Sequence, residues 1–247
     1  VFNNRKTDLM IAIIREQQDA DQDADKLREA GIPAIGVGVL TCHSNMPALT
    51  RSGRDCQAII FTSMRAISKD YLELDVPVWC VGKATAQQAR DFGYDVVEVE
   101  TNNAKELADA LAGAITPDAG ALLWVSGRHT AFDLVSYLAR DNIKVVKQIV
   151  YEMVPNEYLS GDFVDMVKAG KITAITVLSK RMLNSFMYLM DAEDLWGYHK
   201  DWTVFTFSKG TITKEQSLAF SAHIICDSSN FEDLLQTIKN WYSKSQD

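Results

Sequence analysis

Six apolar segments of the chain end beside a cationic residue, most of them with a hydroxyl or a glycine next to it. They read Ile13-Ile14-Arg15, Phe61-Thr62-Ser63-Met64-Arg65, Val81-Gly82-Lys83, Val125-Ser126-Gly127-Arg128, Val177-Leu178-Ser179-Lys180-Arg181 and Phe207-Ser208-Lys209-Gly210. We expect each segment to be a strand that a helix follows. In open α/β sheets, free backbone amides and the helix dipole favour anions at such corners. The pattern therefore predicts a ligand with several negative charges.

Four hydroxyl residues, Ser63, Thr85, Ser179 and Thr211, lie where we expect helices to begin. Ser and Thr are preferred N-caps, so capping alone explains these positions. A capped helix N-terminus can also offer its amides to a carboxylate. Both interpretations stay open for each of the four residues.

Familiar catalytic motifs are absent from the sequence. There is no GxxxxGK[ST] phosphate loop, no GxGxxG after the first strand and no GxSxG nucleophile elbow. The four histidines are scattered without the spacing of metal ligands, and only His129 lies in a predicted ligand loop. The four cysteines form no CxxC pair. We therefore expect no metal site and no disulfide.

The charge balance argues against general nucleic-acid binding. The formal net charge is −8, and basic residues form no runs. No apolar run approaches the roughly 18 residues that a membrane span needs. The first eight residues are polar and lack the layout of a signal peptide. We expect a cytoplasmic protein that binds neither nucleic acid nor membranes.

Apolar, β-branched runs alternate with helical periodicity along the whole chain. The predicted strands are residues 9–14, 34–40, 58–62, 76–81, 96–99, 121–125, 144–154, 172–178, 203–207 and 223–226. The predicted helices include residues 19–29, 84–92, 104–114, 131–140 and 231–242. Such alternation predicts an α/β fold with parallel sheets covered by helices on both faces.

An internal repeat divides the chain further. Residues 58–65 resemble residues 174–181, and residues 81–85 resemble residues 207–211. Residues 10–40 similarly resemble residues 123–151. The chain thus has the form A, B, A′, B′, which predicts two small doubly wound domains of similar topology. A cleft between two domains is the usual place for a ligand.

The order and spacing of these motifs resemble the uroporphyrinogen-III synthase family over about residues 10–241. The motifs that carry the resemblance are Ile60-Phe61-Thr62-Ser63, Val81-Gly82-Lys83-Ala84-Thr85-Ala86, Val150-Tyr151-Glu152-Met153-Val154-Pro155 and Ile175-Thr176-Val177-Leu178-Ser179. The resemblance implies two flavodoxin-like α/β domains joined by a two-stranded linker. The first domain would comprise residues 1–38 and 156–247, and the second residues 42–149. The linker strands would lie near residues 38–41 and 150–155.

The resemblance also implies a reaction. The family cyclises hydroxymethylbilane, a linear tetrapyrrole with many carboxylates, into uroporphyrinogen III; it inverts ring D, releases water and uses no cofactor. Such an enzyme is a lyase of tetrapyrrole and heme biosynthesis, and we expect it to be a monomer.

Tyr151 is the candidate acid beside the leaving hydroxyl. A buried tyrosine bound to backbone is the alternative interpretation of this residue. The candidate substrate-binding residues are Arg15, Ser63, Arg65, Lys83, Thr85, Ser126, Gly127, Arg128, Ser179, Lys180 and Thr211.

Two places depart from the family pattern. Ser208-Lys209-Gly210-Thr211-Ile212 stands where the family usually has Gly-Pro-x-Thr-Ala, and Lys180 stands where proline is common. A catalytically inactive homologue that binds a tetrapyrrole or another polyanion is therefore the alternative function. A two-domain sensor of a small anionic metabolite is a third hypothesis.

Overall fold

The chain divides into two compact units, each with its own hydrophobic core. The computed structural model describes residues 9–45, 47, 51–226 and 231–246. One unit comprises Val1–Thr41 and Val154–Asp247, and the other comprises Cys42–Met153. We call them the split unit and the continuous unit.

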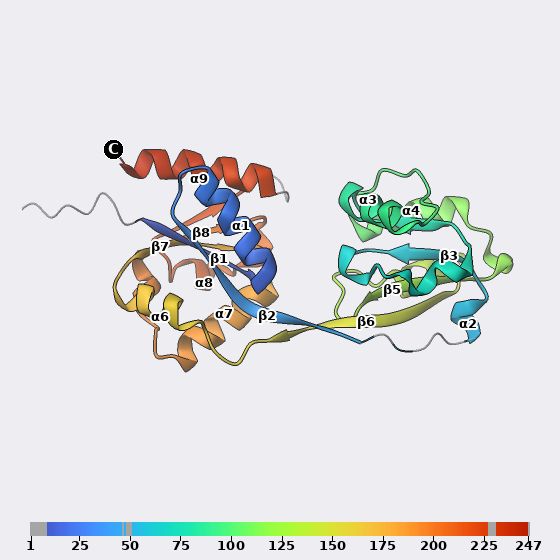
Figure 1. Ribbon diagram of the computed structural model, residues 1–247, viewed down its shortest axis with the longest axis horizontal. Coiled ribbons are helices and arrows are strands. Elements are labelled where there is room, and N and C mark those ends of the chain that lie inside the picture. The colour runs from blue at the N-terminus through green and yellow to red at the C-terminus, as the bar shows by residue number, and fades with distance from the viewer. Residues whose placement is uncertain (1–8, 46, 48–50, 227–230, 247) are drawn as a thin grey trace, which may run out of the picture. The chain divides into compact units, whose positions relative to one another are not determined.

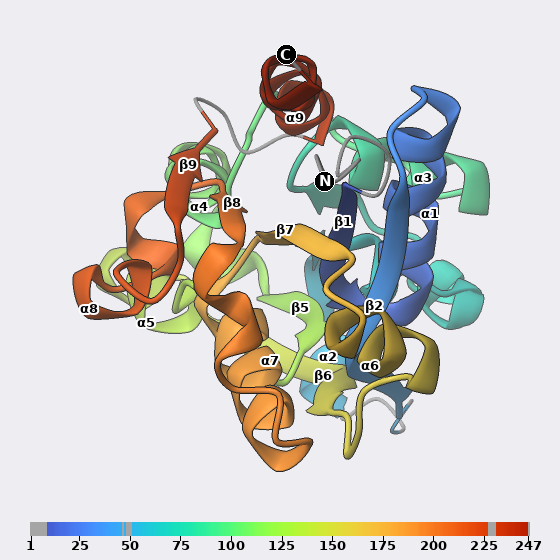
Figure 2. The ribbon, with the colours of Figure 1, turned by 90° about the vertical axis from the view of Figure 1, so that its left-hand side faces the viewer.

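The split unit contains a parallel sheet in the order β2-β1-β7-β8-β9. Its strands are β1 (Met10–Glu16), β2 (Ala34–Ser44), β7 (Ile172–Val177), β8 (Thr203–Thr206) and β9 (Ala222–Ile225). Its helices are α1 (Gln17–Glu29), α6 (Gly161–Lys168), α7 (Lys180–Ala192), α8 (Lys214–Ser217) and α9 (Phe231–Gln246), with the 3₁₀ turns η5 (Tyr198–Asp201) and η6 (Lys209–Thr211). Figure 2 shows the ribbon turned by 90°, with this unit facing the viewer.

Helices cover both faces of the split unit's sheet, as parallel strands require. Ala24 and Leu27 of α1 join Leu234 and Ile238 of α9 in one core beneath the sheet strands. On the other face, α6 and α7 contact each other through Phe163 and Phe186, whose ring centroids lie 6.0 Å apart. Figure 1 shows α1 and α9 on one side of the sheet and α6 and α7 on the other.

The continuous unit contains four parallel strands in the order β4-β3-β5-β6. Its strands are β3 (Cys56–Phe61), β4 (Val78–Cys80), β5 (Ala121–Gly127) and β6 (Val145–Pro155). Its helices are α2 (Arg51–Arg54), α3 (Lys83–Phe92), α4 (Ala104–Ala114) and α5 (Leu134–Leu138), with the turns η1 (Met64–Ala66), η2 (Lys69–Leu74), η3 (Pro117–Ala119) and η4 (Ala139–Asp141). Every residue of β5 is buried, because layers pack on both faces of this central strand.

Two strands, β2 and β6, pass from one unit into the other. In the split unit, the backbone N–H of Asn156 donates to the carbonyl of Val39 at 3.1 Å. In the continuous unit, the N–H of Asn45 donates to the carbonyl of Val150 at 2.8 Å. The two crossing segments are therefore hydrogen-bonded to each other near both of their ends.

Two sequence-based expectations about elements need correction. Residues 96–99 do not form a strand, since only a single bridge joins Val96 to Val78. The helix expected over residues 131–140 is shorter, because Asp133 caps α5 and a 3₁₀ turn follows from Ala139. None of the described helices combines the length and the apolar character that a membrane crossing demands.

Candidate functional site

A pocket of about 410 Å³ opens at the carboxyl ends of β3 and β5 in the continuous unit. Three predicted site residues, Ser63, Gly127 and Tyr151, line it together. The other lining residues are Thr62, Asn103, Ala104, Lys105, Trp124, His129, Thr130, Ala131 and Phe132. We call this cavity the tyrosine pocket.

Tyr151 owes its place in this pocket to a β-bulge and a glycine. The register between β5 and β6 shifts after the pair Ser126–Ile149, so that Tyr151 lies opposite Gly127. A Cβ atom on Gly127 would stand 2.6 Å from Cζ of the tyrosine ring. Only glycine lets the ring lie this close to the backbone of β5.

A second pocket of about 390 Å³ also has Tyr151 in its wall. Its other lining residues are His43, Asn45, Pro47, Arg128, Lys147, Gln148, Ile149 and Glu152. We call it the lysine pocket. Tyr151 therefore lies between two cavities, a position from which a phenol can contact more than one part of a large ligand.

Arg128 of the lysine pocket is held by its neighbours on β6. Its Nε donates to Oε2 of Glu152 at 2.7 Å, and its backbone N–H donates to the carbonyl of Tyr151 at 2.9 Å. Nε2 of His129 lies 3.4 Å from the other Glu152 oxygen. The hydrogen bond from Arg128 keeps the pKa of Glu152 below its ordinary range, so this carboxylate stays ionised. The Arg128 amide is already engaged within the protein.

The remaining candidates of the continuous unit lie close to strand ends. Ser63 caps η1, and its hydroxyl accepts a hydrogen bond from the N–H of Arg65 at 3.3 Å. The hydroxyl of buried Ser126 donates to the carbonyl of Gly127. Lys83 is exposed at the start of α3 and forms an ion pair with Glu100 at 3.2 Å.

Thr85 does not begin a helix. Gly82 is the N-cap of α3, and Thr85 is a buried residue in the first turn. A glycine with positive φ makes this tight entry into the helix possible. An N-cap role therefore does not explain the position of Thr85, whereas it does explain the position of Ser63.

Three candidates lie at the carboxyl ends of β7 and β8 in the split unit. Ser179 is the N-cap of α7, where its hydroxyl accepts from the N–H of Met182 at 3.3 Å, and Lys180 is exposed beside it. Thr211 ends η6 and is buried, with its Oγ1 3.2 Å from Oγ of Ser208. Thr211 thus does not begin a helix, since Thr213 caps α8.

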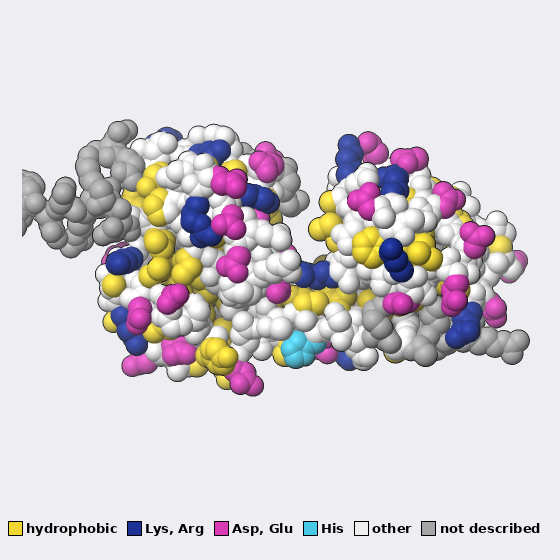
Figure 3. Space-filling model, in the orientation of Figure 1, with side chains coloured by type: hydrophobic (Ala, Val, Ile, Leu, Met, Phe, Trp, Pro, Cys, Tyr) yellow, Lys and Arg dark blue, Asp and Glu magenta, His cyan; other side chains and the backbone are white. Residues whose placement is uncertain are grey.

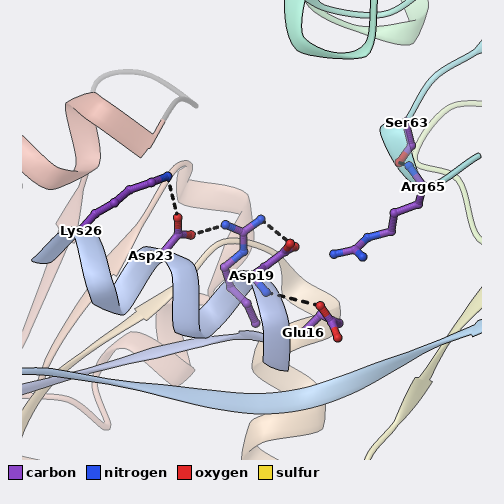
Figure 4. Close-up of polar contacts among 7 residues, drawn as sticks. Glu16, Asp19, Asp23, Lys26, Ser63 and Arg65 are labelled. Atoms are coloured by element: carbon purple, nitrogen blue, oxygen red, sulfur yellow. Dashed lines mark hydrogen bonds and ion pairs between the residues drawn. The ribbon is translucent and has the colours of Figure 1, made fainter. Parts of the chain in front are cut away.

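Arg15 is bound to acidic residues of the helix that follows its strand. It forms ion pairs with Asp19, at 3.1 Å, and with Asp23, whose other oxygen contacts Lys26 (Figure 4). Asp23 is only 3% exposed. A buried carboxylate without a cation would be costly, so a structural role explains Arg15 without any ligand.

Lys147 and Trp124 are lining residues that the sequence reasoning missed. Lys147 interrupts the apolar run of β6, and its Nζ lies 4.7 Å from the centroid of the Trp124 ring. A lysine inside an apolar strand next to Tyr151 was a signal that could have found it. On the face drawn in Figure 3, Lys and Arg side chains are interspersed with Asp and Glu over both units, so the site's cations belong to no broad basic surface there.

The described residues offer no cluster of three or more His, Cys, Asp or Glu side chains suited to a metal ion. The groups present at the two pockets include a phenol, hydroxyls, cations, the imidazoles of His43 and His129 and the carboxylate of Glu152. They can bind carboxylates and move a proton.

Comparison with known proteins gives a family. The model described as "Uroporphyrinogen-III synthase HemD" matches residues 21–236. A solved uroporphyrinogen-III synthetase from Helicobacter pylori 26695 has 15% identity and a TM-score of 0.65, over 94% of this chain and 99% of that one. A mutant uroporphyrinogen III synthase from the extremely thermophilic bacterium Thermus thermophilus has 11% identity and a TM-score of 0.57, over 96% and 99%. The curated proteins include no match to this sequence.

The two solved structures share the mixed α/β fold, with its mainly parallel strands. Because their sequence identities are low, the likeness to them shows the fold alone. The family model covers most of the chain, which confirms the resemblance inferred from the sequence motifs. The chain belongs to the uroporphyrinogen-III synthase family, whose function lies in porphyrin and heme biosynthesis.

Proposed function

We propose that this chain cyclises hydroxymethylbilane into uroporphyrinogen III, with inversion of ring D and loss of water. The observation that carries the proposal is the position of Tyr151, set against Gly127 between two pockets at the carboxyl edge of a parallel sheet. Ligands of open α/β sheets bind at this edge.

Tyr151 has the role of the acid in this proposal. Its phenol donates a proton to the departing hydroxyl, and the electron pair of the breaking C–O bond leaves with that oxygen as water. The remaining azafulvenium cation is electron-poor, and a pyrrole carbon attacks it to give a spiro intermediate. The protein then contributes mainly by holding a flexible chain so that the right carbon attacks.

The carboxylates of the substrate are the second basis of the proposal. Ser63, Arg65, Lys83, Thr85, Ser126, Gly127 and Arg128 of the continuous unit and Arg15, Ser179, Lys180 and Thr211 of the split unit are the proposed binding residues. Ser63, Gly127 and Arg128 have the strongest support, because each lines a pocket that also contains Tyr151. Arg15 has the weakest, because Asp19 and Asp23 already hold it.

We also propose that the two units are the two flavodoxin-like domains of this family. The domains would comprise residues 1–38 with 156–247, and residues 42–149, with linker strands near residues 38–41 and 150–155. The hydrogen bonds of Asn45 and Asn156 between the crossing strands support a two-stranded linker. The proposal also holds that this chain is a cytoplasmic monomer and that it binds neither nucleic acid nor membranes.

The test is an assay with freshly generated hydroxymethylbilane, followed by oxidation and chromatographic separation of the uroporphyrin isomers. We expect the type III isomer. If only the type I isomer forms, as in the enzyme-free control, the chain is no synthase. Uroporphyrin binding in that case would favour the inactive homologue, and a thermal shift with an unrelated anionic metabolite alone would favour a sensor.

A further inference from the structure

Lys147 is a cation of the lysine pocket that has no carboxylate partner within the described chain. Three of the pocket's lining residues carry a formal charge at neutral pH, namely Arg128, Lys147 and Glu152. Arg128 and Glu152 are paired at 2.7 Å. Among the residues that the structure describes, no acidic oxygen lies within ion-pair distance of Lys147 Nζ. The pocket therefore keeps one positive charge, although the whole protein is acidic.

The ammonium group of Lys147 is held in place without being saturated. Its Nζ lies 3.4 Å from both the carbonyl oxygen of Arg128 and Oγ1 of Thr130. These are long contacts for hydrogen bonds, and an ammonium has three hydrogens to donate. The group thus keeps donor capacity for a further oxygen.

Trp124 orients this lysine. The two residues are partners across β5 and β6, and Nζ lies over the indole ring. Trp124 is itself fixed, because it is almost fully buried and its Nε1 donates to Oγ1 of Thr62 at 3.2 Å. A cation over a fixed aromatic face has fewer positions to sample, which lowers the entropy lost when an anion binds.

The cost of partial burial also points to an anionic ligand. Desolvation lowers the pKa of Lys147, and the charge of Asp133 opposes this only in part. An anion in the pocket would restore the interaction that the lysine loses when it leaves water. Lys147, Ile149 and Tyr151 all line this one pocket, so an anion at Lys147 would belong to the same ligand that meets Tyr151.

We propose that Lys147 binds an acetate or propionate carboxylate of the tetrapyrrole and so sets the position of the substrate relative to Tyr151. This inference rests on the proposed function, because it takes the tetrapyrrole as the ligand. Lys147 is a binding residue in this scheme and takes no part in proton transfer.

The experiment compares Lys147→Gln and Lys147→Arg with the wild type. Loss of a charge-assisted hydrogen bond should raise the KM for hydroxymethylbilane about tenfold in Lys147→Gln, with little change in kcat. Lys147→Arg keeps the charge and should stay close to the wild type. Lys144→Gln is the control, because Lys144 is exposed and lines neither pocket.

A binding measurement separates this inference from the proposed function. Quenching of tryptophan fluorescence gives the Kd for uroporphyrin III, the stable oxidised form of the product, at low and high salt. Lys147→Gln should weaken binding and flatten its salt dependence. An inactive wild type whose uroporphyrin binding still depends on Lys147 would refute the synthase but support the carboxylate site.

The inference is wrong if Lys147→Gln keeps both the KM and the Kd within about twofold of the wild type. Should that variant fail to fold, carbon-13 methylated lysines in the wild type give a second readout, with Lys147→Arg assigning the resonance. A shift of the Lys147 signal on addition of uroporphyrin III supports the site, and an unchanged signal overturns it.

Discussion

At the scale of single residues, Tyr151 is the group whose chemistry can be tested most directly. Tyr151→Phe removes the phenolic oxygen and keeps the ring that packs against Gly127. We expect kcat to fall about a hundredfold, a common loss when a positioned acid is removed. The melting temperature should stay near that of the wild type. Single-turnover measurements of type III isomer formation check this, and an unchanged rate would remove Tyr151 from the mechanism.

Gly127 is predicted to act through Tyr151. In Gly127→Ala, the new Cβ would meet the tyrosine ring at 2.6 Å, so the ring must move. Overpacking of this kind costs about 1–3 kcal/mol of folding free energy. The displaced phenol should also lower kcat while the KM changes less. Urea unfolding and steady-state kinetics measure the two effects, and the matched control is Gly113→Ala, where a Cβ would meet nothing within 4 Å. A fully active Gly127→Ala would show that the ring's position is not important.

The residue scale also shows where sequence reasoning succeeds and where it fails. Motifs predict Tyr151 and Gly127 separately, and the structure places them in contact. Their closeness depends on the register shift between β5 and β6, which no sequence pattern marks. Lys147 stands out as a lysine in an apolar run, but its proposed role depends on Trp124 and Thr130 around it, which the run does not reveal.

At the scale of elements, Ser179 allows capping and ligand binding to be separated. Its hydroxyl accepts from the N–H of Met182 at the start of α7, so Ser179→Ala should cost about 1 kcal/mol of stability. Asp is an equally good cap, and Ser179→Asp should therefore keep the stability. A new negative charge should nevertheless repel a substrate carboxylate and raise the KM. Thermal unfolding measures the stability of both variants, and steady-state kinetics measure their KM. An unchanged KM in Ser179→Asp would show that Ser179 serves only to cap the helix.

Element positions are predictable where helical periodicity and a cap residue agree, and less so elsewhere. The helix predicted over residues 104–114 has the bounds of α4, because Asn103 caps it and its apolar residues recur with helical spacing. The strand expected over residues 96–99 does not form, since Val96 makes only a single bridge to Val78 while Val97 and Val99 pack against a core. The sequence pattern groups Arg15 with ligand cations, but the acidic residues of α1 that hold it lie one and two turns further along the helix.

At the scale of the whole molecule, the internal repeat is the most informative signal. It shows which pieces of the chain are equivalent, and the family resemblance implies that the two ends of the chain share one domain; β1 does pair with β7. The repeat alone does not predict this pairing, because equivalence of two pieces does not say which pieces pack together. The same signal contains no information on which strand ends form pockets, because that depends on loops such as residues 127–133.

The two units should respond to acid in different pH ranges. In the split unit, burial lowers the pKa of His199 and of His223 below the ordinary 6.5. The unfolded chain therefore takes up protons first, so this unit loses stability as the pH falls from about 7 through 6.5 and below. In the continuous unit, hydrogen bonds from Ser136 and Arg128 lower the pKa of Asp133 and of Glu152 from 3.8 and 4.5. Their contribution to stability is present above these values and is lost only as the pH falls through the lowered ones.

Hydrogen exchange followed by mass spectrometry at pH 7.5, about 5.5 and about 4 should show α7 and β8 losing protection before β3 and β5. His199→Gln should shift the loss of protection in α7 and β8 to lower pH. Loss of protection in both units at one pH would contradict the assignment of different pH ranges to them.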